Sequence, residues 1–198
     1  MLKIGITGGI GSGKTTICKV FETLGIPVFY ADTVAKQIMV TDEILINGVK
    51  DAFGKESYTE DGVLNNKHIA GIVFHNAAEL AKLNELVHPA VFRAFDKWVK
   101  EIPESVPYIL KEAALLFESG SYRMCDQNIV VVAPEESRIK WVMDRDRVTA
   151  ELVKARIDKQ LSDEEKMKQA DHIIYNNETE SLIIQVTRLH QLFLNISE

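Results

Sequence analysis

Four glycines, a lysine and a threonine stand within eight residues near the start of the chain, in the segment GGIGSGKT at residues 8–15. This spacing fits the pattern G-x-x-x-x-G-K-[ST], in which the glycines let backbone N–H groups converge on phosphate oxygens. An apolar segment at 3–7 precedes it and a helical pattern at 15–24 follows, so the positive end of a helix faces the same point. The segment therefore predicts a site for the phosphates of a nucleotide.

The polar residues of this loop have separate expected tasks. We expect the Lys14 ammonium to bring charge to the β- and γ-phosphates. We expect the Thr15 hydroxyl to complete the coordination of a Mg²⁺ ion that arrives with the nucleotide. A glycine-rich loop that only turned the chain would not need a lysine and a threonine at these two positions.

Two acids end predicted strands, where a parallel sheet places its ligands. Asp32 follows an apolar strand predicted at 26–30. It either caps the helix predicted at 33–39 or orients a substrate hydroxyl near the γ-phosphate and takes its proton. Glu112 closes a strand predicted at 106–111, and it is either a capping acid or a contact to Mg²⁺ or substrate.

Arginines gather in a charged region after the strand predicted at 127–133. Arg145, Arg147 and Arg156 either form a solvated helical face or belong to a mobile lid that covers the developing charge of phosphoryl transfer. Arg145 is the first candidate for the second role. We expect both tryptophans, Trp98 and Trp141, to be packing residues.

The composition excludes several classes of protein. The net charge of −6 argues against a general nucleic-acid binder, and no apolar run is long enough for a membrane span. Two cysteines without CxxC spacing favour a reduced, cytoplasmic protein. Five scattered histidines argue against a metal site built by protein side chains alone. A monomer is favoured, with no nucleic-acid or membrane partner.

The order of the predicted elements points to one architecture. Strands and helices alternate before residue 42 and after residue 104, which predicts five parallel strands covered by helices on both sides. The stretch between is mostly helical, with its longest pattern at 77–100 interrupted at His88-Pro89, where the proline would either kink the helix or separate two helices. Gly25 should end the first helix. Short helices are also expected at 113–120, 135–145, 149–160 and 163–170, with a last strand at 172–175 and a closing helix at 179–194.

An ordered series of segments over nearly the whole chain resembles the dephospho-CoA kinase family. The segments are ITGGIGSGKTT at 6–16, GIPVFYAD at 25–32, FG at 53–54, VHP at 87–89, LLFE at 115–118, RD at 145–146, ARIDKQ at 155–160 and ADHIIYNN at 170–177. The resemblance implies that ATP phosphorylates the ribose 3'-hydroxyl of dephospho-CoA, giving CoA and ADP in the last step of CoA biosynthesis. The chain departs from the family at Trp141, where many members carry arginine or lysine, and at Glu112, where aspartate is usual.

The resemblance also implies a fold and a set of site residues. The fold is a three-layer, adenylate-kinase-like P-loop kinase fold, with a nucleotide-binding core at 1–41, 104–135 and 171–198. A helical insertion at 42–103 would hold the CoA arm, and 136–170 would form the lid. Asp32 would be the catalytic base, with Lys14 and Arg145 also catalytic, and His88, Glu112 and Arg156 would contact the substrate. The residues expected to bind ATP are Gly9, Gly11, Ser12, Gly13, Lys14, Thr15, Thr16, Arg145, Asn176 and Asn177.

Two other functions remain open from the residues alone. The first is a P-loop kinase for another small acceptor, such as a nucleoside monophosphate or shikimate. The second is a nucleotide-dependent switch or scaffold protein that hydrolyses ATP slowly and has no acceptor. The acceptor that stimulates ADP release would distinguish all three.

Overall fold

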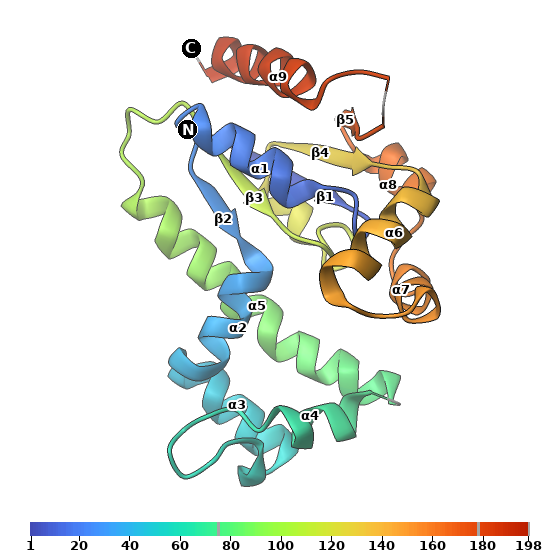
Figure 1. The fold of residues 1–198 in the computed structure, drawn as a ribbon. Helices are drawn as coiled ribbons and strands as arrows, with labels where there is room; N and C mark the ends of the chain where they lie inside the picture. Colours follow the sequence, from blue (N-terminus) through green and yellow to red (C-terminus); the bar gives the residue numbers. More distant parts are fainter. Residues whose placement is uncertain (75, 178, 198) are drawn as a thin grey trace. The chain divides into compact units, whose positions relative to one another are not determined.

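The chain forms two compact units in a computed structural model that describes residues 1–74, 76–177 and 179–197 (Figure 1). The first, here called the sheet unit, holds Met1–Tyr30 and Ile102–Glu198. The second, here called the helical unit, holds Ala31–Glu101. None of the helices formed by the described residues is long and apolar enough to cross a membrane.

In the described part of the sheet unit, five parallel strands form one sheet, as the sequence predicted. The strands are β1 (Leu2–Gly8), β2 (Val28–Tyr30), β3 (Tyr108–Glu112), β4 (Gln127–Val132) and β5 (His172–Tyr175), in the spatial order β2-β3-β1-β4-β5. Strand β1 is central, and its residue Ile6 lies between Glu112 of β3 and Ile129 of β4 in the register. The carboxyl end of β1 therefore opens in the middle of one sheet edge, where a loop can meet a ligand.

Helices cover both faces of this sheet, so the unit has three layers. The helices are α1 (Lys14–Thr23), α6 (Glu135–Asp146), α7 (Ala150–Ile157), α8 (Asp163–Gln169) and α9 (Leu182–Ser197), with a short 3₁₀ turn η2 (Ser121–Met124). Helices α1 and α9 pack on the face of β1 that carries Ile4 and Ile6. Gly5 points to the opposite face, where a side chain at its position would meet Leu116.

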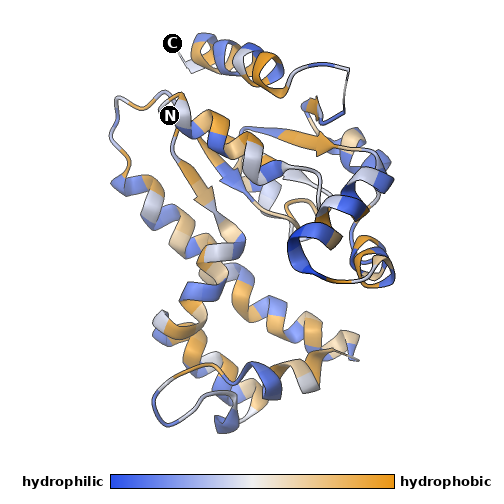
Figure 2. Ribbon diagram, in the orientation of Figure 1, coloured by the Kyte–Doolittle hydropathy of each residue, from blue (hydrophilic) through white to orange (hydrophobic). Residues whose placement is uncertain are grey.

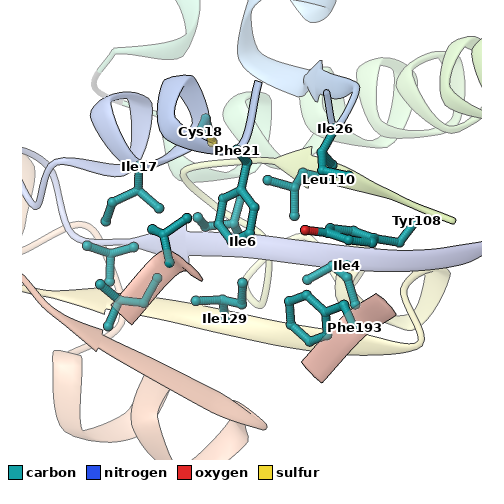
Figure 3. Close-up of a cluster of buried hydrophobic side chains, with 13 residues drawn as sticks. Ile4, Ile6, Ile17, Cys18, Phe21, Ile26, Tyr108, Leu110, Ile129 and Phe193 are labelled. Atoms are coloured by element: carbon teal, nitrogen blue, oxygen red, sulfur yellow. The ribbon is translucent and has the colours of Figure 1, made fainter. Parts of the chain in front are cut away.

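The core between α1, α9 and the sheet is apolar and aromatic (Figure 3). The buried ring of Tyr108 lies edge-on to Phe21 at 6.3 Å and to Phe193 at 5.3 Å between ring centroids. The Tyr108 hydroxyl lies 2.6 Å from His190 Nδ1, so its polar end is satisfied. The apolar residues of β4 stand out in orange in Figure 2, which matches a strand buried on both faces.

Helix α1 ends at the glycine that the sequence indicated. Gly25 has a left-handed backbone with φ of 82°, and its N–H donates to the Glu22 carbonyl at 2.9 Å. The Ile26 N–H donates to the Phe21 carbonyl at 3.1 Å. These two bonds form a Schellman cap, which directs the chain from α1 back toward β2.

In the helical unit, the described residues form four helices and a 3₁₀ turn. They are α2 (Ala31–Thr41), α3 (Glu43–Phe53), η1 (Lys55–Ser57), α4 (Asn66–Val73) and α5 (Ala77–Glu101). Helix α5 packs against α2, α3 and α4. The unit therefore begins at Ala31, before the insertion expected from 42, because α2 packs on α5 within this unit.

Three local expectations were wrong. Of the two alternatives at His88-Pro89, the separation into two helices is wrong: α5 is one helix with Pro89 inside it, because proline removes one backbone donor while packing against three helices holds the rest. The helix expected at 113–120 is absent, and residues 114–120 form a series of turns, with the Gly120 N–H donating to the Phe117 carbonyl at 3.0 Å. Asp32 does not precede its helix as a cap, since α2 already begins at Ala31 and Asp32 lies in the first turn.

Candidate functional site

The glycine-rich loop connects the carboxyl end of β1 to the start of α1. Its backbone closes on itself where the Ser12 N–H donates to the Gly9 carbonyl at 3.0 Å. Gly11 and Gly13 have left-handed φ values of 77° and 93°. A Cβ at Gly11 would lie 2.8 Å from the Arg138 carbonyl, and one at Gly13 would lie 2.5 Å from Asn176 Nδ2. Both positions therefore need glycine for conformation and for space.

A cavity of about 480 Å³ lies against this loop. Its walls come from the loop, from α6 and from the chain around β5 and α9. The lining residues are Gly11, Gly13, Lys14, Thr15, Thr16, Trp141, Val142, Arg145, Asn176 and Leu182. Seven of them were predicted as nucleotide-binding residues, namely Gly11, Gly13, Lys14, Thr15, Thr16, Arg145 and Asn176.

Lys14 and the first turn of α1 give this cavity its positive character. The Lys14 side chain is nearly buried, and its Nζ donates to the Gly8 carbonyl at 2.9 Å. The N-cap of α1 is Gly13, which has no side chain to accept from the N–H groups of the first turn. Those N–H groups, with the helix dipole behind them, can bind an anion.

The oxygen chemistry of the cavity fits Mg²⁺ carried by a nucleotide. Thr15 and Thr16 are both exposed where they line the cavity. Among the described residues, no three or more His, Cys, Asp or Glu side chains lie together so that they could hold a metal ion. Magnesium usually takes few protein ligands and completes its shell with phosphate oxygens and water, so a single Thr15 hydroxyl is sufficient.

Two side chains for which no role was predicted contact the glycine-rich loop and support it. The Ile10 N–H donates to Gln160 Oε1 at 2.8 Å. Arg138 of α6 is 5% exposed, its guanidinium lies against Gly9, and its Nη2 is 3.5 Å from Asp163 Oδ2. Gln160 could have been noticed in the segment ARIDKQ, whereas nothing local in the sequence distinguishes Arg138 from the other charged residues of its helix.

Arg145 and Arg156 share one carboxylate. Arg145 Nε donates to Asp146 Oδ1 at 2.7 Å, and Arg156 Nη1 donates to Asp146 Oδ2 at 3.0 Å. The hydrogen bond from Arg145 is the main cause that lowers the pKa of Asp146, which stays ionised at neutral pH. Asp146 thus fixes both arginines, and Arg145 lines the cavity. Arg147 ends α6 in a left-handed conformation.

The remaining predicted residues lie in different places. Glu112 is nearly buried at the end of β3, opposite Tyr30 in the register. Asn176 reaches the loop, where its Nδ2 donates to the Ser12 carbonyl at 2.9 Å. Asn177 instead accepts from Thr179 Oγ1 at 2.6 Å.

Asp32 and His88 belong to the helical unit, on α2 and α5 respectively. The His88 ring stacks on Phe92 with centroids 6.5 Å apart. Burial lowers the pKa of His88, so the ring is mainly neutral at pH 7. As a neutral ring it could offer a hydrogen bond to a ligand but not a full positive charge.

The helical unit contains a second cavity of about 680 Å³ with largely apolar walls. Its walls come from α2, α4, α5 and the segment before α4. The lining residues are Ala35, Lys36, Met39, Val40, Val63, Leu64, Asn66, Ile69, Leu83, Asn84 and Val87. The family resemblance implied a substrate-binding role for this stretch, but none of these residues was predicted to take part.

Comparison with known proteins gives one consistent result. The family model described as "CoaE: Dephospho-CoA kinase" matches residues 2–181. A dephospho-CoA kinase from Salinibacter ruber is 45% identical over 181 residues, which cover 90% of each chain. A crystal structure from Thermus thermophilus has a TM-score of 0.85 and 30% identity, covering 98% of this chain and 97% of the other. Dephospho-CoA kinase from Campylobacter jejuni has a TM-score of 0.72 and 27% identity, covering 99% and 98%.

Proposed function

This chain belongs to the dephospho-CoA kinase family, and we propose that its loop cavity binds ATP while its helical unit receives dephospho-CoA. The reaction transfers the γ-phosphoryl group of ATP to the ribose 3'-hydroxyl of dephospho-CoA, giving CoA and ADP in the last step of CoA biosynthesis. The observation that carries the donor assignment is the cavity that joins Lys14, Thr15 and Arg145 at one end of a helix.

On the donor side, the loop binds the phosphates through backbone N–H groups. The hydrogen bond from Lys14 Nζ to the Gly8 carbonyl already restrains this side chain. Its ammonium can therefore contact the β- and γ-phosphates with little further loss of side-chain entropy. Mg²⁺ bound with ATP would be held by Thr15 and would neutralise phosphate charge during transfer. Arg145 is held by Asp146 and stabilises the negative charge on the γ-phosphoryl group while this group moves from ATP to the acceptor oxygen.

On the acceptor side, Asp32 orients the 3'-hydroxyl and takes its proton. The support is its place in the chain, two residues after β2 and inside the first turn of a helix, together with the family resemblance. The carboxylate accepts the proton as the oxygen attacks phosphorus, which avoids a free oxyanion. Glu112, His88 and Arg156 are proposed as further contacts to the acceptor.

The apolar cavity of the helical unit is our candidate for the pantetheine arm of dephospho-CoA. Its walls are aliphatic, while Lys36, Asn66 and Asn84 offer polar atoms that could pair with amides. Such a mixture suits a flexible chain that carries amide groups between methylenes. Binding energy from this remote arm would position the ribose for transfer.

We further propose that the enzyme acts in the cytoplasm as a monomer. A buried Cys18 and a partly buried Cys125, both free thiols, fit a reducing compartment. Light scattering of the purified chain would check the oligomeric state directly.

The function is tested by measuring ADP release from ATP and Mg²⁺ with a panel of acceptors. The panel contains dephospho-CoA, AMP, CMP, adenosine and shikimate. We expect strong stimulation by dephospho-CoA alone, with CoA as the product. Stimulation by another acceptor would contradict the acceptor assignment while keeping the donor site, and no stimulation by any acceptor would favour a nucleotide switch.

A further inference from the structure

Trp141 is the aromatic side chain in the wall of the loop cavity. A packing residue was expected at this position, yet Trp141 is 42% exposed and lines the cavity. Single exposed apolar side chains are common on open protein surfaces, but this ring lies in the wall of a cavity beside the phosphate-binding loop. The position therefore calls for an explanation by ligand chemistry.

The cavity wall divides into a polar part and an apolar part. The polar part consists of the loop residues Gly11, Gly13, Lys14, Thr15 and Thr16, together with Arg145 and Asn176. The apolar part consists of Trp141, Val142 and Leu182. A nucleoside triphosphate has the same division, because its phosphates are charged and its base is flat and weakly polar.

The apolar wall is fixed in place by the core beneath it. Val142 is fully buried, and Leu182 packs against the core cluster at the start of α9. Trp141 lies four residues before Arg145 on α6, so the two side chains share one helix face. Asp146 holds Arg145 in place, and the indole one helical turn before Arg145 lines the same cavity.

We propose that Trp141 stacks on the purine base of ATP and sets the affinity for the nucleoside part of the donor. The inference rests on the proposed assignment of the loop cavity to ATP and adds the group that recognises the base. Stacking on an indole suits a base because both surfaces are flat and polarisable, and it adds binding energy beyond the phosphate contacts.

The first test observes the indole directly. The chain has two tryptophans, so the Trp98→Phe protein carries Trp141 alone as its tryptophan. We expect ATP to change the Trp141 emission on binding, and magnesium tripolyphosphate, which lacks a base, to leave it nearly unchanged. Calorimetry on the same protein confirms ATP binding, and ATP that binds without changing the emission would overturn the proposal.

The second test separates stacking from a structural role. In Trp141→Leu we expect the Kd for ATP to rise about tenfold, while the inhibition constant of tripolyphosphate stays within about twofold. Trp141→Phe keeps a flat ring and should recover most of the affinity for ATP. An equal loss for ATP and tripolyphosphate would show that Trp141 only supports the cavity, and unchanged ATP affinity in Trp141→Leu would also overturn the proposal.

Measurements on the wild-type protein separate a failure of the stacking proposal from a failure of the donor assignment. If it forms CoA from ATP and dephospho-CoA while both Trp141 tests give the contrary result, the stacking proposal alone fails. If wild-type protein binds neither ATP nor tripolyphosphate, the donor assignment fails and the stacking proposal fails with it.

Discussion

The cavity at the phosphate loop and the apolar cavity of the helical unit differ in the part of the chain that makes their walls. In the sheet unit, backbone N–H groups and short side chains from residues 11–16 form half of the lining. In the helical unit, side chains spread from Ala35 to Val87 form all of it. Half of the first lining comes from one local turn of the chain, whereas the second lining exists only after α2, α4 and α5 have packed.

This difference corresponds to the two ligands that we assign. A phosphate chain is highly charged and has a fixed geometry, so a rigid turn with converging donors and one anchored lysine can recognise it. A pantetheine arm is flexible and mostly uncharged, so its recognition depends on the area of apolar contact. The comparison predicts that single changes in the loop act through charge, and that changes in the helical unit act through shape.

The largest effect should come from Asp32→Asn, which removes the proposed base without changing side-chain size. We expect turnover to fall by about 10²–10⁴-fold while the Kd for ATP stays nearly unchanged. The check is the rate of CoA formation together with calorimetry of ATP binding. Asp51→Asn, at an exposed position on α3, is the matched control. Near-normal turnover in Asp32→Asn would remove Asp32 from the mechanism.

Lys14→Met should reduce both turnover and ATP affinity, because it removes the charge held at the end of β1. We expect turnover to fall by about 10²–10³-fold. Lys19→Met makes the same change on an exposed position of the same helix and should have little effect. Equal losses in the two variants would mean that overall charge, and not the loop geometry, controls the donor site.

Leu83→Trp tests the apolar cavity by filling it. We expect the KM for dephospho-CoA to rise about tenfold, with the KM for ATP unchanged, because the acceptor arm loses its space. Leu80→Trp adds the same ring at an exposed position on α5 that does not line the cavity. If both variants keep the wild-type KM for dephospho-CoA, the arm binds elsewhere.

Asp42→Ala should lower stability without a comparable effect on chemistry. Asp42 Oδ1 accepts the Leu45 N–H at 2.8 Å as the N-cap of α3, and Arg93 Nη2 donates to Oδ2 at 2.9 Å. We expect the free energy of unfolding, measured in urea at pH 7, to fall by about 1 kcal/mol, mostly because the cap is lost.

The same side chain gives a pH dependence. Burial raises the pKa of Asp42, but the Leu45 N–H and Arg93 outweigh it and the net pKa is lowered. Its contribution is therefore present above about pH 4 and is lost as the pH falls through the lowered pKa. A variant that loses no stability at pH 7 would show that the cap is dispensable.

The smallest effect should be a pH slope from His172 in the sheet unit. Burial lowers its pKa despite the nearby Asp171 carboxylate, and its Nε2 lies 2.7 Å from Gln127 Oε1. The folded state therefore favours the neutral ring, and its stabilisation is present above about pH 6.5 and lost as the pH falls through the lowered pKa. We expect thermal unfolding between pH 7.5 and 5.5 to depend less on pH in His172→Gln, and an unchanged slope would contradict this.

The sequence predicted the sheet unit and its loop because their determinants are local. The loop contains its glycines, lysine and threonine within one short segment, and the strands are apolar runs bounded by turns. The sequence did not predict that α5 would continue through Pro89, because packing against neighbouring helices decides that. It also assigned Trp141 to packing, since the direction in which an α6 side chain points depends on how α6 lies beside the loop.

The apolar cavity could not be predicted for a related reason. Its residues, such as Met39, Val63 and Leu83, are ordinary apolar positions of separate helices and loops. An apolar residue that faces a cavity has the same sequence pattern as one that faces the core. Only the packed structure distinguishes the two cases.

The most direct test of the account measures the binding of each ligand to each altered cavity. Calorimetry would give the Kd of ATP and of dephospho-CoA for wild type, Lys14→Met and Leu83→Trp. The account predicts that Lys14→Met weakens ATP alone and that Leu83→Trp weakens dephospho-CoA alone. Equal weakening of both ligands by either variant, or intact dephospho-CoA binding in Leu83→Trp, would contradict the division of donor and acceptor between the two cavities.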